Sequence, residues 1–128
     1  KYGYPFCRGR IFNEHEKDSG QYNNTEEIFW ATGACMFVRG EVFNELWGFD
    51  VKFFAHMEEV DLCWRMKNLG HKIMVEPSSV VYHLGGGTLN KVSPRKTYLN
   101  FRNKKNLLPK NFAKIEINQR KDVQESAF

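Results

Sequence analysis

The chain has 128 residues and a net charge of +4, and this length suits one compact domain at most. No apolar run approaches the roughly 20 residues that a membrane-spanning helix needs. The sequence begins at Lys1 without an initiator Met or the apolar core of a signal peptide, so we expect the natural gene product to begin earlier. Three widely spaced cysteines (Cys7, Cys35 and Cys63) match neither a disulfide framework nor a zinc motif, which predicts a reducing, cytoplasmic location.

The N-terminal third divides into a polar part and an apolar part. Residues 1–27 are rich in turn-forming residues, which predicts a long irregular loop or connection. Residues 28–38 are apolar and rich in strand-forming types, with an interruption at Gly33 and Ala34. We expect a strand, a close backbone approach at Gly33, and a second strand over 35–38.

Two helices follow in the predicted order. Residues 41–47 fit a short helix, and Gly48 is the residue that ends it. Residues 58–69 fit a helix more clearly, because acidic residues occupy its first turn and Gly70 stops it. An apolar stripe at helical spacing runs along this second helix: Leu62, Cys63, Met66 and Leu69.

The C-terminal part predicts two more strands and a longer helix. Residues 71–75 are typical of a buried strand, and residues 80–83 of another that ends just before three glycines at 85–87. A Ser-Pro pair opens a predicted helix over about 94–108, with serine as the N-cap and proline at the first helical position. We expect residues 111–128 to form a basic, mobile tail.

Three carboxylates crowd the start of the 58–69 helix: Glu58, Glu59 and Asp61. The helix macrodipole favours their ionised forms while their mutual repulsion disfavours them, so the balance can poise one of them as a base. The alternative interpretation is that acidic residues are simply favourable in a first helical turn. A glycosidase acid–base pair fits less well, because neighbours on a helix diverge and do not face each other across a bond.

His83 ends a predicted buried strand just before the three glycines. An imidazole at a strand end is a common ligand for ions such as Mn²⁺, and a glycine cluster lets a backbone approach a ligand closely. The alternative is that His83 is structural. The glycines do not form a Walker phosphate loop, because no Gly-Lys-Ser/Thr follows them.

In their order along the chain, these segments resemble the C-terminal half of bacterial family 2 glycosyltransferases, including the rhamnosyltransferase-like ones. The resemblance covers about residues 28–108. It is carried by an ordered set of motifs: Thr32–Arg39, Phe43, Trp47–Asp50, Phe53–Phe54, Glu58–Arg65, Gly70, Val80–His83 with its glycines, and Arg102–Asn103. The resemblance implies an α/β GT-A fold, with residues 28–110 as its acceptor-side half and a mixed sheet with flanking helices.

The resemblance also implies roles for individual residues. In the family an acidic pair opens this helix and its second member is the general base, a position held here by Glu59, with Glu58 before it. Asp61 matches the acidic residue two positions further on, and His83 matches the family's metal-associated histidine, so we expect Glu59 and His83 to lie across one cleft. The family usually has Asp at the base position. Glu59 is one methylene longer, and if this misplaces its carboxylate, Glu58 or Asp61 becomes the better candidate.

Four further positions match the substrate cleft. Gly33 and Ala34 match the segment that lines the donor–acceptor cleft, while His56 and Trp64 lie near the base and are candidates for substrate contact. The implied reaction is an inverting, hexosyltransferase-type transfer from a nucleotide-sugar to a glycan or lipid-linked acceptor, in the polysaccharide biosynthesis of a bacterial cell envelope. A divalent cation (Mg²⁺ or Mn²⁺) is the implied cofactor.

Two parts that this reaction needs are missing from the sequence. No Asp-x-Asp metal motif occurs, and no βαβ half with a nucleotide pocket is present. We therefore expect these residues to belong to a longer chain and to be inactive alone. The sheet edges and apolar surface that the missing half leaves uncovered favour a homodimer.

Basic residues concentrate between Lys91 and Lys121, where ten Lys and Arg accompany a single Glu. A solvated helix face and tail explain this pattern simply. The alternative is a surface that docks on anionic headgroups at the inner face of the cytoplasmic membrane. Nucleic acid is not expected as a partner, because no DNA- or RNA-binding motif appears.

Two other classes of function stay open. A non-catalytic carbohydrate-binding module would use the aromatic residues, which make up 15% of the chain, a high share that also suits a core. A structural interaction domain would have kept the fold and lost the chemistry, and Glu59 in place of the usual Asp is its main support.

Overall fold

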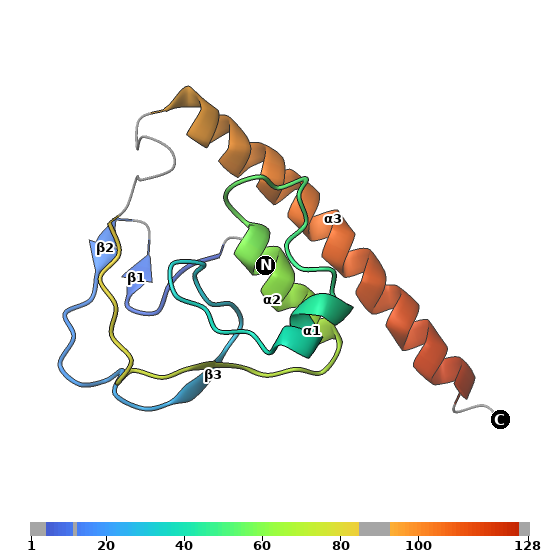
Figure 1. Ribbon diagram of the computed structural model, residues 1–128, viewed down its shortest axis with the longest axis horizontal. Helices are drawn as coiled ribbons and strands as arrows, with labels where there is room; N and C mark the ends of the chain where they lie inside the picture. The colour runs from blue at the N-terminus through green and yellow to red at the C-terminus, as the bar shows by residue number, and fades with distance from the viewer. Residues whose placement is uncertain (1–4, 12, 85–92, 126–128) are drawn as a thin grey trace.

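The protein is described by a computed structural model that covers residues 5–11, 13–84 and 93–125, with side chains to residue 112. In Figure 1 one long helix runs along one side of the molecule, a second helix lies against it, and the short strands lie on the far side. The described residues are therefore α/β, as the sequence predicts. The elements in chain order are β1 (Arg10–Ile11), β2 (Glu14–His15), β3 (Glu26–Ile28), α1 (Gly40–Glu45), α2 (Glu58–Asn68), β4 (Ile73–Val75) and α3 (Pro94–Glu125).

Helix α2 forms the centre of the fold. Leu62 and Cys63 have no exposed surface and Met66 is buried, so three residues of the predicted apolar stripe face the core, whereas the fourth, Leu69, is 47% exposed. The helix ends at Asn68, one residue before its predicted end. Gly70 follows with a φ of +82°, a left-handed conformation that glycine adopts without cost and that stops helices.

Helix α1 is short and ends in a tight turn. It spans Gly40–Glu45 against a predicted range of 41–47, because Trp47 already has a φ of +60°. Gly48 has a φ of +64°, and its N–H donates to the carbonyl of Phe43 at 2.8 Å. A Cβ on Gly48 would lie 2.9 Å from two ring atoms of Phe43, so both the backbone and the available space require glycine there.

The strands form two small antiparallel pairs. β1 pairs with β2, and β3 pairs with β4 in a register that puts Glu27 opposite Met74. The segment 1–27, expected to be irregular, thus contains the β1–β2 pair and the start of β3. The strands predicted over 35–38 and 80–83 are not formed, and this prediction is wrong. Their residues have strand propensity, but no neighbouring strand among the described residues pairs with them, and the predicted mixed sheet is replaced by antiparallel pairs.

Helix α3 is longer than the sequence suggested. It begins at Pro94 as predicted but continues to Glu125, so the predicted end near Leu108 is wrong. Pro109 lies inside the helix with its side chain exposed, although proline removes one backbone hydrogen bond and crowds the preceding turn. No helix in the described part of the chain combines the length and the apolar composition needed to cross a membrane.

The apolar core consists of two small clusters that both include residues of α2. The first contains Val42, Leu62, Cys63, Met66 and Ile73, and the second contains Phe53, Val60 and Leu107. Several large apolar side chains remain outside, and Phe37 (94%), Trp47 (92%) and Tyr82 (100%) are almost fully exposed. The three cysteines are free. The described residues therefore bury only part of their apolar surface. The apolar surface that remains exposed is larger than singly scattered surface residues would explain.

Candidate active site

Three side chains at the start of α2 and just before it each carry one buried polar atom without a hydrogen-bond partner. Oε2 of Glu58, Oε2 of Glu59 and Nε2 of His56 are each buried, and none has a partner among the described atoms. A buried polar atom without a partner costs roughly 1–3 kcal/mol of stability. Proteins therefore keep such atoms mainly where water, an ion or a ligand supplies the missing partner. All three residues are ones that the sequence singles out, and together they define the candidate site.

Glu59 is a carboxylate whose environment favours its protonated form. Burial raises the pKa of Glu59, and the negative charge of Glu58 adds to the rise, while backbone N–H groups at the helix start oppose it. A carboxylate with a raised pKa is a stronger base and is better matched to neutral pH, where general-base catalysis is most effective. This property is the one that the implied base at position 59 needs.

The loop before α2 has an unusual backbone. Phe54, His56 and Met57 have φ values of 61°, 69° and 73°. Residues other than glycine adopt such values at a cost of about 1 kcal/mol or more each. Met57 is the N-cap of α2, and its side chain makes no capping hydrogen bond. Strain of this kind persists only where surrounding groups hold it, and it clusters at functional sites.

Asp61 has a different environment from the two glutamates. It has no exposed surface, and its Oδ2 accepts from Arg65 Nε and Lys110 Nζ, both at 2.8 Å. Its Oδ1 accepts from Asn111 Nδ2 at 3.0 Å, and Lys110 also pairs with Asp50 at 2.7 Å. Both oxygens of Asp61 are thus engaged, and the structure does not place it with the unpaired atoms of the candidate site. The sequence pattern could not separate it from the glutamates, because two of its partners lie 49 and 50 positions further along the chain.

The structure brings Gly33 and Glu59 together. A Cβ built on Gly33 would lie 3.8 Å from Cβ of Glu59, an ordinary van der Waals contact, so the turn at Gly33 lies against the first turn of α2. Ala34, the next residue, is exposed, and its N–H donates to Oγ1 of Thr32 at 3.4 Å. The turn that we expect to line the cleft therefore forms one side of the candidate site.

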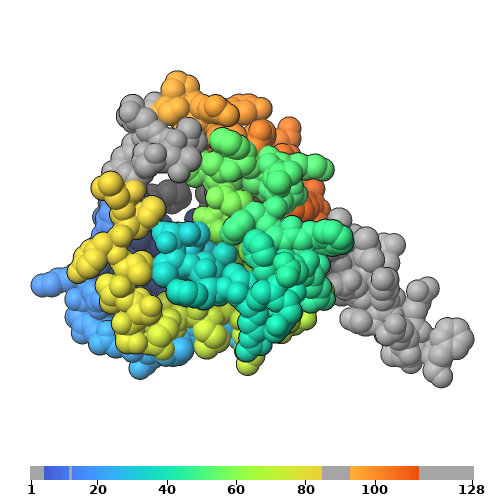
Figure 2. Space-filling view, in the orientation of Figure 1, coloured from blue at the N-terminus to red at the C-terminus, as the bar shows by residue number. Residues whose placement is uncertain are grey.

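Trp64 lies in the wall of an open, mainly apolar cavity of about 1530 Å³. Its ring meets Phe29 and Phe112 edge-on, with centroids 5.4 and 5.1 Å away. Residues 5–8, strands β3 and β4, and residues 35–39 form much of the rest of the wall. Figure 2 shows the surface hollowed between the yellow segment near residue 80 and the cyan segment near residue 35. An apolar wall of this kind suits apolar groups rather than charged ones.

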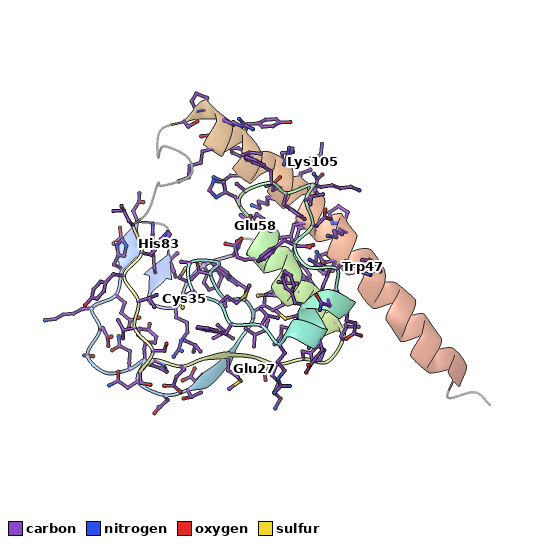
Figure 3. The ribbon with its side chains drawn as sticks, viewed as in Figure 1. Glu27, Cys35, Trp47, Glu58, His83 and Lys105 are labelled. Carbon is purple, nitrogen blue, oxygen red and sulfur yellow. The ribbon has the colours of Figure 1, made fainter. Side chains whose placement is uncertain are left out.

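His83 does not join the candidate site. It lies on an exposed, extended segment, and Figure 3 shows it well apart from Glu58 at the start of α2. Val60 and Val81 line the cavity, but Glu59 and His83 do not, so the described residues do not form the shared cleft that we expected between them. Within the part of the chain that the structure describes, no three His, Cys, Asp or Glu side chains form a group that could hold a metal ion. Because metal centres gather several such ligands, these residues alone do not fit one.

Comparison with known proteins relates the chain to glycosyltransferases over part of its length. The relative is the N-acetylglucosaminyl-diphospho-decaprenol L-rhamnosyltransferase of Mycobacterium tuberculosis, matched in two strains with 39% identity over 56 residues. The match covers 44% of this chain and 18% of the relative, so the chain spans only a small part of that protein's length. No protein-family model matches the chain, and no solved structure matches it. The comparison supports a glycosyltransferase relationship.

Proposed function

We propose that this chain is the acceptor-side portion of an inverting family 2 glycosyltransferase with a GT-A fold, and that Glu59 is its general base. The observation that carries the proposal is the state of Glu59, which combines a pKa raised by burial with a buried carboxylate oxygen that has no partner. The partial similarity to a rhamnosyltransferase supports glycosyltransferase function in general.

In the proposed reaction Glu59 accepts the proton of the acceptor hydroxyl through its unpaired Oε2. The hydroxyl oxygen attacks the anomeric carbon of the donor sugar, the bond from that carbon to the phosphate oxygen breaks, and the nucleoside diphosphate leaves from the opposite face. His56 Nε2, also unpaired, is a candidate to hold the same acceptor by a hydrogen bond. General-base assistance of this kind contributes roughly 10²–10⁴-fold to the rate.

The proposed substrates are a nucleotide-sugar donor and a glycan or lipid-linked acceptor. The relative's name specifies a diphospho-decaprenol acceptor, and we propose the same class, a sugar on a lipid diphosphate, for this chain. Its acceptor would lie at a membrane, and α3 offers exposed Arg95 and Lys105 with exposed Tyr98 and Phe101. Basic and aromatic side chains together suit an anionic surface such as the inner face of the cytoplasmic membrane. The donor site and a complete metal centre require residues beyond those described.

The test is a rate measurement on the enzyme that contains these residues, with a nucleotide-sugar and a sugar-diphospho-lipid as substrates. Glu59→Gln is expected to lower kcat about 10³-fold, because it removes the base and keeps the shape. The matched control, Glu58→Gln, is expected to lower kcat less than about tenfold, through the pKa of Glu59 alone. Full activity of the Glu59→Gln enzyme would overturn the assignment. The 128 residues alone are expected to transfer no sugar.

A carbohydrate-binding module is the second candidate, favoured by the exposure of Phe37, Trp47 and Tyr82. Aromatic faces of this kind bind sugar rings without any catalytic group. This candidate predicts sugar binding that needs neither nucleotide nor metal and that is unchanged by Glu59→Gln. Calorimetric titration of the unmodified and substituted chains with oligosaccharides separates it from the enzyme.

A further inference from the structure

Asn103 on α3 is a buried polar side chain that the proposed reaction does not use. It has no exposed surface, and its Nδ2 donates to the backbone carbonyls of Phe53 (2.8 Å), Ala55 (2.8 Å) and His56 (2.7 Å). A side-chain amide has two N–H groups, so the three carbonyls share them. One side chain thereby gathers three carbonyls of the loop that leads into α2.

Arg102 fixes the orientation of this amide. Its Nε donates to Oδ1 of Asn103 at 2.9 Å, which leaves the amide nitrogen facing the loop. Its Nη2 donates to the carbonyls of Lys52 and Phe53 at 2.8 and 3.0 Å. Hydrogen bonds from a charged donor are stronger than neutral ones. The loop is therefore held from α3, about fifty positions away in the sequence.

The loop needs such support because its own sequence does not favour its shape. Phe54, His56 and Met57 have positive φ, and no glycine stands among residues 50–60. Met57 is also the N-cap of α2 but makes no side-chain cap, so the loop's own side chains do not fix the start of the helix. The direction in which Glu59 points depends on how this first turn begins.

We propose that Asn103, oriented by Arg102, is a positioning residue of the candidate active site that holds the strained loop and so keeps His56 and Glu59 in place at the start of α2. The catalytic purpose of holding His56 and Glu59 in place rests on the proposed function. The hydrogen bonds of Asn103 to the loop do not depend on it. Without the amide, the carbonyls of Ala55 and His56 lose their side-chain donor and turn to water, while the carbonyl of Phe53 keeps Arg102 Nη2. The φ values then relax, and water reaches the carboxylate of Glu59.

The test compares substitutions of Asn103 in the 128-residue chain. Asn103→Ala removes the donors and the volume, whereas Asn103→Asp keeps the volume but has no N–H to donate. NMR follows the titration of the Glu59 carboxyl group and the exchange of the Asp61 amide, which donates to the Met57 carbonyl at 2.9 Å. Both variants should bring the pKa of Glu59 down toward the ordinary glutamate value. Both should also speed exchange of that amide by about tenfold or more.

Two control variants separate positioning from a general loss of stability. Ile73→Ala weakens the other core cluster, and Asn106→Ala replaces an exposed asparagine of the same helix. Both should leave the titration of Glu59 unchanged, even where Ile73→Ala lowers the unfolding midpoint. Asn103→Ser keeps one donor in a smaller side chain, and it should be intermediate, which provides a readout where the aspartate variant does not fold.

Two results would overturn the proposal. One is a Glu59 titration that is unchanged in Asn103→Ala. The other is an Asn103→Asp chain that titrates like the unmodified one, because then only volume would matter. This experiment does not depend on sugar transfer. If Asn103 proves not to position the loop, Glu59 can still be the general base. If Glu59 proves not to be the base, the effect of Asn103 on the loop can still be real.

Discussion

Replacing Asp61 with Asn tests whether this carboxylate holds the fold together or belongs with the candidate base. The change keeps the shape, but it removes the charge that meets Arg65 and Lys110. Neutralising one partner of a buried ion pair costs about 3–5 kcal/mol. The Arg65 side chain is only 7% exposed, whereas that of Lys110 is 28% exposed and keeps Asp50 as a second partner. Because Lys110 contributes less, we expect a loss near the lower limit, about 3 kcal/mol in the free energy of unfolding.

Urea unfolding followed by circular dichroism measures this loss. The midpoint should fall while the m-value stays constant, because the surface exposed on unfolding does not change. In a thermal scan the same loss corresponds to a decrease of roughly 10 °C in Tm for a chain of this size.

The matched control is Glu59→Gln, which neutralises a carboxylate whose Oε2 has no partner. It should change the free energy of unfolding by less than about 1 kcal/mol, since no hydrogen bond of that oxygen is lost. A loss below about 1 kcal/mol for Asp61→Asn, or one no larger than the control's, would refute the structural role and return Asp61 to the candidates for the base.

Three further outcomes follow from the same structure. Gly48→Ala should lower the free energy of unfolding by about 2–4 kcal/mol, because the positive φ and the contact with the Phe43 ring both penalise a Cβ; a urea midpoint within error of the original would contradict this. Trp47→Asn should raise the free energy of unfolding by about 0.5–1 kcal/mol, because asparagine tolerates a positive φ better than an exposed tryptophan does. A decrease in that experiment would show that the indole ring is needed. The folded-state pKa of Glu59 is raised, so its stabilising contribution is complete below the unfolded value of about 4.3 and is lost as pH rises through the folded value. Urea unfolding across the acid-to-neutral range should therefore show the original chain losing stability relative to Glu59→Gln with rising pH, and parallel curves would contradict the raised pKa.

Local patterns in the sequence predicted the elements that bury an apolar face within this chain. The sequence predicts helix α2 to within one residue. Its apolar stripe includes Leu62 and Met66, and Gly70 marks where the helix ends. The strands over 35–38 and 80–83 failed, because strand propensity needs a paired neighbour and no described segment provides one. The end of α3 was misplaced because Pro109 normally stops a helix, whereas here it lies inside one with its ring exposed.

The candidate site was only partly visible in the sequence for a related reason. Spacing along α2 put Glu58 and Glu59 in one turn and predicted their common location. It could not show that Asp61 is engaged by Lys110, or that Asn103 holds the loop before the helix, because these contacts join residues 47–50 positions apart. The Arg102–Asn103 pair did appear among the motifs of the resemblance, but no local rule assigns it a role.

Two polar side chains on α3, Asn103 and Lys110, fix the position of that helix along its axis. Asn103 grips the loop before α2, and Lys110 reaches Asp50 and Asp61, seven residues or roughly 10 Å further along the axis. A slip of α3 by one turn, about 5.4 Å along its axis, would separate both side chains from their acceptors, so these contacts fix the position of the helix. A residue inserted between Asn103 and Lys110 would rotate one side chain about 100° around the helix axis relative to the other. The helix could then keep the hydrogen bonds to the loop carbonyls or the ion pair with Asp61, but not both.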